Sequence, residues 1–183
     1  MSEINDLFSI EDIDKIIKRN PSAPKFTLAD VILILLYADK NNPLIGKTKQ
    51  MKEIFLTLVE LQTLKAENVK FDFHRYGPYS EEVDDTIDHM LFSNYISAVG
   101  TKNENNFGIK ITNKGLSYIS KTFEELPEKT KQLLLNKRED WDTLTSTGVI
   151  NYVYTHYPKY LAESVFKKRY APIDWDNDLE KDP

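Results

Sequence analysis

Residues 80–111, SEEVDDTIDHMLFSNYISAVGTKNENNFGIKI, decide the fold that the sequence predicts. Ser80 can cap a helix with an acidic first turn, and apolar side chains recur at positions 83, 87, 90 and 91, so a helix is expected up to about Phe92. Two short strands are then expected over 95–99 and 107–111, because a polar loop rich in turn-forming residues joins two apolar runs. A helix followed by a β-ribbon with a polar tip is the way in which a winged helix ends.

Two further helices and a strand are expected upstream of this stretch. Thr27 begins a helix that runs to about Asp39, and its core is apolar nearly all round, which predicts a central, buried helix. The next helix spans about 48–64, where apolar residues recur at helical spacing. Alternation of apolar and polar residues over 69–73 predicts a half-buried strand.

The remaining segments complete a mainly helical chain. A short helix is expected over 9–20, and others after Thr112, after Pro127 and around 149–154. We therefore predict a mainly α fold with a small antiparallel β-ribbon, arranged as a winged-helix-like core with flanking helices. The expected organisation is an N-terminal helical segment (1–25), the winged-helix-like core (26–125), a C-terminal helical extension (126–170) and an acidic tail (171–183).

Composition excludes several classes of protein. The chain has 183 residues and a mean hydropathy of −0.49. Its longest apolar run, 31–36, is far shorter than the roughly 18 residues that a membrane span requires. The N-terminus is acidic, whereas a secretory signal begins with a basic region. Without cysteine, the chain forms no disulfide, thiolate zinc site or cysteine nucleophile. We expect a soluble, cytoplasmic protein that does not enter membranes.

Charge weighs against the usual way in which a winged helix binds DNA. The net charge is −5 and the isoelectric point is near 5.3, whereas affinity for DNA depends mostly on neutralising phosphates. The helix expected to enter the major groove would offer five carboxylates in place of base-reading side chains: Glu81, Glu82, Asp84, Asp85 and Asp88. A protein partner is favoured over DNA, because an acidic helix face is a good docking surface for a basic protein.

The segment His74–Ser80, HRYGPYS, separates the expected strand from the acidic helix. Its arginine and two tyrosines could present a cation and aromatic faces to a partner. Alternatively, Gly77-Pro78 forms a structural turn whose tyrosines pack on the core. On the first interpretation, the partner-binding residues are His74, Arg75, Tyr76, Tyr79, Glu81, Glu82 and Asp85.

DNA binding stays open as an alternative function. It would use Lys47, Lys49, Lys52, Lys102, Lys110 and Lys114, near the start of the 48–64 helix and on the wing. A solvated, lysine-rich surface is the commoner explanation of such residues. A homodimer formed through exposed tyrosines, at positions 152, 154, 157 and 160, is a further possibility.

No pattern typical of catalysis or cofactor binding occurs in the chain. The nucleophile-elbow, phosphate-loop and dinucleotide fingerprints do not occur, and the three histidines, His74, His89 and His156, lie far apart in the sequence. Asp85 and His89 are four residues apart on one helix face, a spacing that rarely binds metal. We expect no catalytic residue, no cofactor and no metal site; an enzyme that no motif reveals ranks third, after the protein-binding and DNA-binding functions.

Three segments carry a resemblance to a known family: Lys47-Thr48-Lys49, residues 73–83 (FHRYGPYSEEV), and Tyr152 to Tyr157 with Pro158. The chain resembles the YwgA-like group of uncharacterised prokaryotic proteins, which is similar to the set containing the SocA antitoxin-like domain. The resemblance spans about Phe26 to Lys168 and centres on the Tyr-Gly-Pro-Tyr-Ser motif. It implies a winged-helix-like core and a regulatory or defence-associated role. It carries over no catalytic residue.

Overall fold

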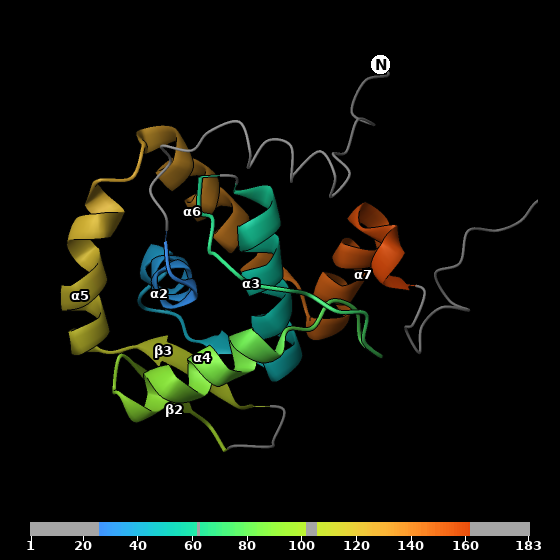
Figure 1. The fold of residues 1–183 in the computed structure, drawn as a ribbon, viewed down its shortest axis with the longest axis horizontal. Helices are drawn as coiled ribbons and strands as arrows, with labels where there is room; N and C mark the ends of the chain where they lie inside the picture. The colour runs from blue at the N-terminus through green and yellow to red at the C-terminus, as the bar shows by residue number, and fades with distance from the viewer. Residues whose placement is uncertain (1–25, 62, 102–105, 162–183) are drawn as a thin grey trace, which may run out of the picture.

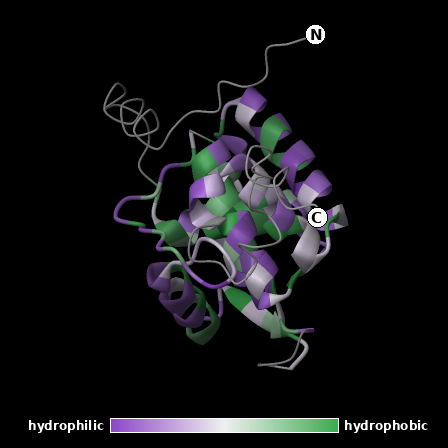
Figure 2. Cartoon of the chain, turned by 90° about the vertical axis from the view of Figure 1, so that its right-hand side faces the viewer, coloured by the Kyte–Doolittle hydropathy of each residue, from purple (hydrophilic) through white to green (hydrophobic). Residues whose placement is uncertain are grey.

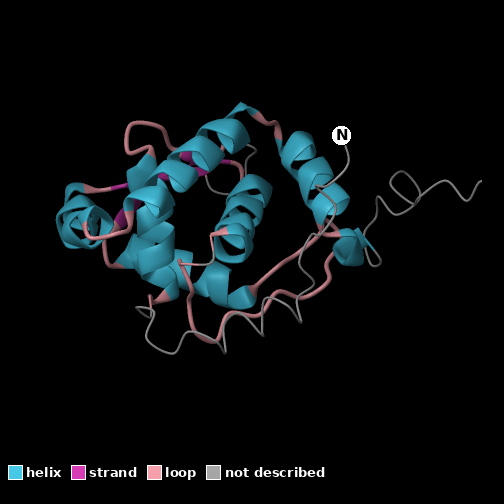
Figure 3. Ribbon diagram, turned by 90° about the horizontal axis from the view of Figure 1, so that it is seen from above, coloured by secondary structure: helices cyan, strands magenta, loops and turns pink. Residues whose placement is uncertain are grey.

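Helices enclose one buried central helix in the computed structural model, which describes residues 26–61, 63–101 and 106–161 (Figure 1). The α-helices are α2 (Leu28–Ala38), α3 (Lys47–Glu60), α4 (Glu81–Phe92), α5 (Asn113–Glu124), α6 (Glu128–Thr143) and α7 (Ser146–His156). The strands are β1 (Leu44–Ile45), β2 (Ile96–Val99) and β3 (Gly108–Ile111), and a 3-10 turn, η1 (Pro158–Leu161), follows α7. Figure 3 shows how little of the described chain is strand. The predicted mainly helical class with a small antiparallel sheet is confirmed.

Helix α2 forms the centre of the fold because its apolar residues cover every side of it. Residues 31–36 are at most 2% exposed, as the sequence predicted. In Figure 1, α5 lies on one side of α2, α3 and α6 lie on the other, and α4 lies below with the sheet. Thr27 and Asp30 form a capping box, with the Thr27 amide donating to Asp30 Oδ2 at 2.9 Å. Figure 2 shows the hydrophobic segments gathered in the interior.

The sheet has the order β1-β3-β2 and is antiparallel throughout. In its register, Leu44 lies opposite Ile109, and Ile96 lies opposite Ile111. The predicted ribbon over 95–99 and 107–111 is confirmed as β2 and β3. The sequence did not reveal β1, because a strand of two residues shows no alternation, and its pairing with β3 is what makes it a strand.

Two predicted elements differ from the structure. The strand expected over 69–73 is wrong: only an isolated bridge between Asp72 and Tyr79 forms there. The alternation has another cause, since Phe71 and Phe73 pack against the aromatic rings of Phe55 and Tyr160. The helix expected over 48–64 ends at Glu60.

The C-terminal helices belong to the same core as the rest of the molecule. Leu134 and Trp141 of α6, and Val149 and Val153 of α7, are at most 1% exposed and lie in one apolar cluster with α2. The expected helix over 9–20, the segment 1–25, the end of the extension after residue 161 and the tail 171–183 lie outside the described residues. No helix in the described part of the chain has the length and apolar character needed to cross a membrane.

Two of the four tyrosines expected to form a homodimer interface, Tyr154 and Tyr160, are buried, whereas Tyr152 and Tyr157 are partly exposed. Tyr154 and Tyr160 are 3% and 4% exposed, and the rings of Tyr157 and Tyr160 pack edge-on against Phe55. The expectation that these side chains are exposed is therefore wrong for Tyr154 and Tyr160.

Candidate functional site

Helix α3 positions the candidate site because three of its buried polar side chains, Gln50, Lys52 and Glu53, each contact a different neighbouring segment. Gln50, Lys52, Glu53 and Thr57 are at most 3% exposed. Gln50 Nε2 donates to the carbonyl of Leu44 at 3.0 Å and so fixes β1. Lys52 and Glu53 reach the loop before α4 and helix α6, respectively. Buried polar groups of this kind specify one arrangement of their neighbours, since each needs its partner in place.

The loop Phe73–Tyr79 is a closed turn. Backbone hydrogen bonds of 2.8 and 3.1 Å join Asp72 and Tyr79, and the amide of Gly77 donates to the carbonyl of His74 at 3.0 Å. Gly77 has a φ of +88°, and a Cβ atom at this position would lie 3.1 Å from the Tyr154 ring. Glycine is therefore required both by the backbone conformation and by the packing. Gly77-Pro78 thus forms a structural turn at the base of this loop, which is one of the two interpretations that the sequence left open.

Lys52 supports the buried base of the loop through a hydrogen bond. Its side chain is 3% exposed, and Nζ donates to the carbonyl of Pro78 at 2.7 Å. Burial of the ammonium group lowers its pKa from the usual 10.5 to about 7. Lys52 therefore acts as an internal support of the loop and offers no charge to a ligand at the surface.

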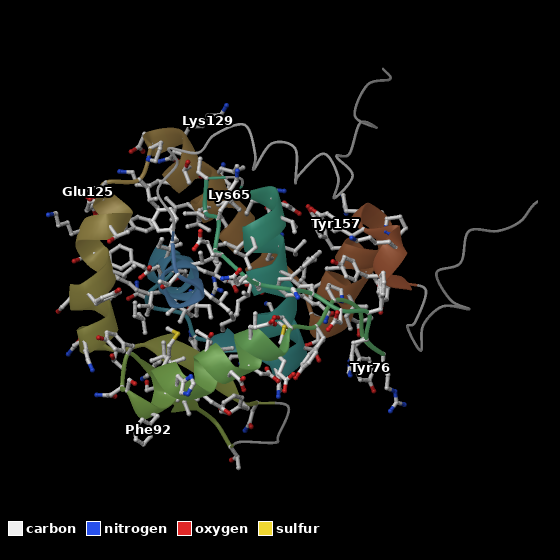
Figure 4. All side chains as sticks on the ribbon, in the orientation of Figure 1. Lys65, Tyr76, Phe92, Glu125, Lys129 and Tyr157 are labelled. Atoms are coloured by element: carbon white, nitrogen blue, oxygen red, sulfur yellow. The ribbon has the colours of Figure 1, made fainter. Side chains whose placement is uncertain are left out.

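The tip of the loop is solvent-exposed, in contrast to its base. Residues 72–76 are all exposed, whereas Gly77 and Pro78 are buried. Phe73 is 50% exposed and Tyr76 is 42% exposed, and Figure 4 shows Tyr76 at the edge of the molecule. The His74 ring lies 5.0 Å from the Tyr79 ring. The structure thus places His74, Arg75 and Tyr76 together on one exposed tip.

Tyr79 and Ser80 connect this tip to the start of α4. The Ser80 hydroxyl accepts from the Val83 amide at 3.4 Å and donates to Glu82 at 2.8 Å, and this second bond is the main cause of the lowered pKa of Glu82. The Tyr79 hydroxyl donates to Asp84 at 2.9 Å, a bond that raises the pKa of Tyr79 to about 12. Tyr79 is therefore committed to the structure, and its ring is only partly exposed.

The outer face of α4 carries carboxylates and a bare aromatic ring. Glu81, Asp85, Asp88 and Phe92 are exposed and recur at intervals of four, three and four residues, so they lie on one side of the helix, with Glu82 exposed beside them. Phe92 is 93% exposed, and Figure 4 shows it at the opposite end of α4 from Tyr76. An exposed stripe with this composition can attract a cationic surface and can bury an aromatic anchor.

The lysines expected to bind DNA do not form a shared cationic patch at the start of α3. Lys47 is 68% exposed but pairs with Asp84 at 2.8 Å, and the Lys49 side chain is 12% exposed between Glu53 and Asp142. The interpretation of these lysines as a solvated surface is also wrong for Lys49 and Lys52. On the ribbon side, Lys110 is exposed, while Lys114 donates to the Ser93 carbonyl at 2.8 Å and lies over the Tyr95 ring. Lys102 lies outside the described residues.

A buried cluster of charges between α3 and α6 had no counterpart among the sequence predictions. Arg138 Nη1 donates to Glu53 Oε2 at 3.0 Å, and Arg138 Nε lies 2.8 Å from Asp142 Oδ2, out of line for a hydrogen bond. Lys49 Nζ donates to the Asp142 carbonyl at 3.0 Å. Burial raises the pKa of Glu53 to about 7 against the opposing effect of the Arg138 charge. One signal was present in the sequence: Arg138 falls in register with the buried positions 130, 134 and 141 of α6.

We also looked for a metal site and for related proteins. Across residues 26–61, 63–101 and 106–161, no group of three or more histidine, aspartate or glutamate side chains could hold a metal ion. No protein-family model matches the chain, and no curated protein sequence matches it either.

Proposed function

We propose that this chain is a cytoplasmic, non-enzymatic regulatory module that binds a protein partner through the tip of the Phe73–Tyr79 loop and the outer face of α4. The observation that carries this proposal is the stripe Glu81–Asp85–Asp88–Phe92, which is exposed along its length on the helix that follows the exposed loop tip. The partner presents lysine or arginine side chains to the carboxylates. A regulatory, antitoxin-like role rests on the resemblance to the YwgA-like and SocA-like proteins.

The composition and rigidity of the loop support protein binding. Tyrosine and arginine are enriched among the residues that contribute most to protein interfaces, and the exposed tip contains Arg75 and Tyr76. The Asp72–Tyr79 bridge, the turn at Gly77 and the Lys52 support hold this tip in one conformation. A preorganised loop loses little conformational entropy on binding, so more of its contact energy contributes to affinity.

The electrostatics of α4 favour protein over DNA. The element order α2-β1-α3-α4-β2-β3 and the strand order β1-β3-β2 support a winged-helix-like core, and in that arrangement α4 would enter the major groove. Exposed carboxylates on that helix would repel the phosphates. The same element order supports DNA binding as a second candidate, in which exposed Lys110 on β3 and Lys114 after it contact the backbone.

Site-specific photo-crosslinking in cells would test the proposal. A photoreactive residue at Tyr76 or Asp85 should capture the same protein, whereas one at Lys121 on α5, whose side chain is 84% exposed, should not. Replacing Glu81, Asp85 and Asp88 with lysine should abolish capture from Tyr76.

A parallel measurement addresses the DNA alternative. The unmodified chain should bind a random-sequence duplex weakly, and the three lysine substitutions should strengthen this binding, because they replace charges that repel phosphate with charges that attract it. Capture of the same protein from Lys121, or tight duplex binding that falls steeply with salt and requires Lys110, would overturn the proposal.

A further inference from the structure

An apolar pocket of about 150 Å³ lies where the first half of α2 meets α5 and the C-terminal end of α4. Its walls are formed by five uncharged residues: Ala29, Leu33, Met90, Tyr95 and Tyr118. Tyr118 is 53% exposed, so the pocket opens at the surface of the molecule. An apolar cavity of about this volume takes up one benzene ring, and the pocket therefore has the right size for an aromatic side chain.

The two tyrosines of the pocket are fixed by contacts with charged residues. Their rings meet edge-on, with centroids 5.3 Å apart. Lys114 Nζ lies 4.1 Å from the centroid of the Tyr95 ring and donates to the Ser93 carbonyl at 2.8 Å. The negative charge of Asp30, to which the Tyr118 hydroxyl is hydrogen-bonded, raises the pKa of Tyr118. The walls are therefore preorganised for binding, and Lys114 places a positive charge beside the Tyr95 wall.

Phe92, the last residue of α4, offers an aromatic ring close to this pocket in the sequence. At 93%, it is the most exposed large apolar side chain among the described residues, and Figure 4 shows it at the outer edge of the molecule. Met90 in the pocket wall is 4% exposed, and two residues turn an α-helix by about 200°, so Phe92 points away from Met90. The ring of Phe92 therefore has to enter the pocket of another molecule.

Opposite charges accompany the ring and the pocket. Asp88 is exposed and precedes Phe92 by four residues, so the two side chains lie on one face of α4 with their Cβ atoms about 6 Å apart. Lys114 is exposed and lies against the Tyr95 ring of the pocket. A ring that enters the pocket of a second copy thus brings Asp88 towards the partner's Lys114. One surface carries both halves of this contact, and a two-fold axis forms the contact twice.

We propose that two copies of this chain form a symmetric homodimer, in which Phe92 of each copy enters the pocket of the other and Asp88 pairs with the partner's Lys114. The dimer is a property of the chain alone and does not rest on the proposed function. It covers Phe92 and Asp88, so it competes with the proposed protein partner for the C-terminal half of the α4 stripe. Self-association is then a means of regulating access to that surface.

Sedimentation equilibrium of the purified full chain, from about 1 to about 200 µM, tests the proposal. The unmodified chain should change with concentration from its 21.3 kDa monomer to a dimer. Phe92→Ala removes both rings and should raise the dissociation constant at least about a hundredfold, because each buried phenyl ring contributes more than about a factor of ten. A chain that stays monomeric over this range, or a dimer that Phe92→Ala leaves unchanged, would overturn the proposal.

Tyr76→Ala is the matched control, because Tyr76 is an exposed aromatic residue at the other end of α4, and this variant should dimerise as the unmodified chain does. An equal loss of the dimer in Tyr76→Ala and Phe92→Ala would contradict the assignment.

Charge reversal tests whether the charged pair lies across the interface. Asp88→Lys and Lys114→Glu should each weaken self-association severalfold, because like charges then meet at both contacts. An equimolar mixture of the two variants should dimerise again, because the mixed dimer brings a lysine opposite a carboxylate at both contacts. A mixture that dimerises no better than its components would show that Asp88 and Lys114 do not meet between copies.

Discussion

The α3–α6 interface and the outer face of α4 are built from the same kinds of residue but hold them in opposite environments. Across the first, polar side chains pair in antiparallel order: Lys49 with Asp142, Glu53 with Arg138, Glu60 with Lys137 at 2.7 Å, and Thr63 with Thr130 at 3.0 Å. On the outer face of α4, Glu81, Asp85 and Asp88 are exposed.

This comparison shows that the role of a charged side chain depends on whether it is buried and on which residue it pairs with. Glu53 is 0% exposed. The interior of a protein does not solvate an ion, so the negative charge of Glu53 is stabilised by its ion pair with Arg138. Asp85 and Asp88 are exposed, so water can solvate their charges. Charges inside the molecule specify how α6 docks, and charges outside specify what the surface attracts.

Breaking the buried pair should have the largest effect. Arg138→Leu leaves the Glu53 carboxylate buried without its cation, and we expect the free energy of unfolding to fall by about 3–5 kcal/mol. The double variant Glu53→Leu/Arg138→Leu should be more stable than Arg138→Leu alone, because it removes both charges from the interior. Urea denaturation of the two variants measures the difference. A double variant less stable than the single one would contradict this account.

Two buried groups should give stability an unusual dependence on pH. Between pH 4.5 and about 7, folded Glu53 binds a proton that the unfolded chain has released, so its contribution falls as the pH rises. Between about 7 and 10.5, folded Lys52 has released a proton that the unfolded chain retains, so its contribution increases with pH. The combined contribution of these two groups is therefore lowest near pH 7.

The Lys52→Met variant isolates the second half of this dependence. The unmodified chain should gain stability, of the order of 2–3 kcal/mol, relative to Lys52→Met between pH 7 and pH 10. Urea denaturation at both pH values measures the change. Parallel curves for the two proteins would show that Lys52 keeps its ordinary pKa in the fold.

Neutralising the outer face of α4 should affect stability least. Asp85→Asn/Asp88→Asn removes exposed charges beyond the first turn of the helix, and we expect the free energy of unfolding to change by no more than about 0.5 kcal/mol. Thermal unfolding at pH 7 measures it. A loss similar to that of Arg138→Leu would show that these carboxylates support the fold, and the contrast between the two regions would fail.

Local signals in the sequence determined most of the fold. Helices α2 and α4, the ribbon of β2 and β3, and the cap residues Thr27 and Ser80 follow from apolar periodicity and from side chains that bond to their own backbone. The acidic character of α4 could also be predicted directly, because five carboxylates fall within residues 81–88 of one expected helix. The partner-binding role of His74, Arg75, Tyr76, Tyr79, Glu81, Glu82 and Asp85 stays a prediction.

Only the tertiary structure decided which charges lie inside. Lys47, Lys49 and Lys52 look alike in the sequence, yet one is exposed, one is paired in a buried cluster and one supports a loop. Glu53 meets Arg138 across 85 positions of the chain, and β1 exists because β3 pairs with it. Periodicity describes one element at a time, whereas burial of a charge depends on a partner from another element, and that partner is brought close only when the chain folds.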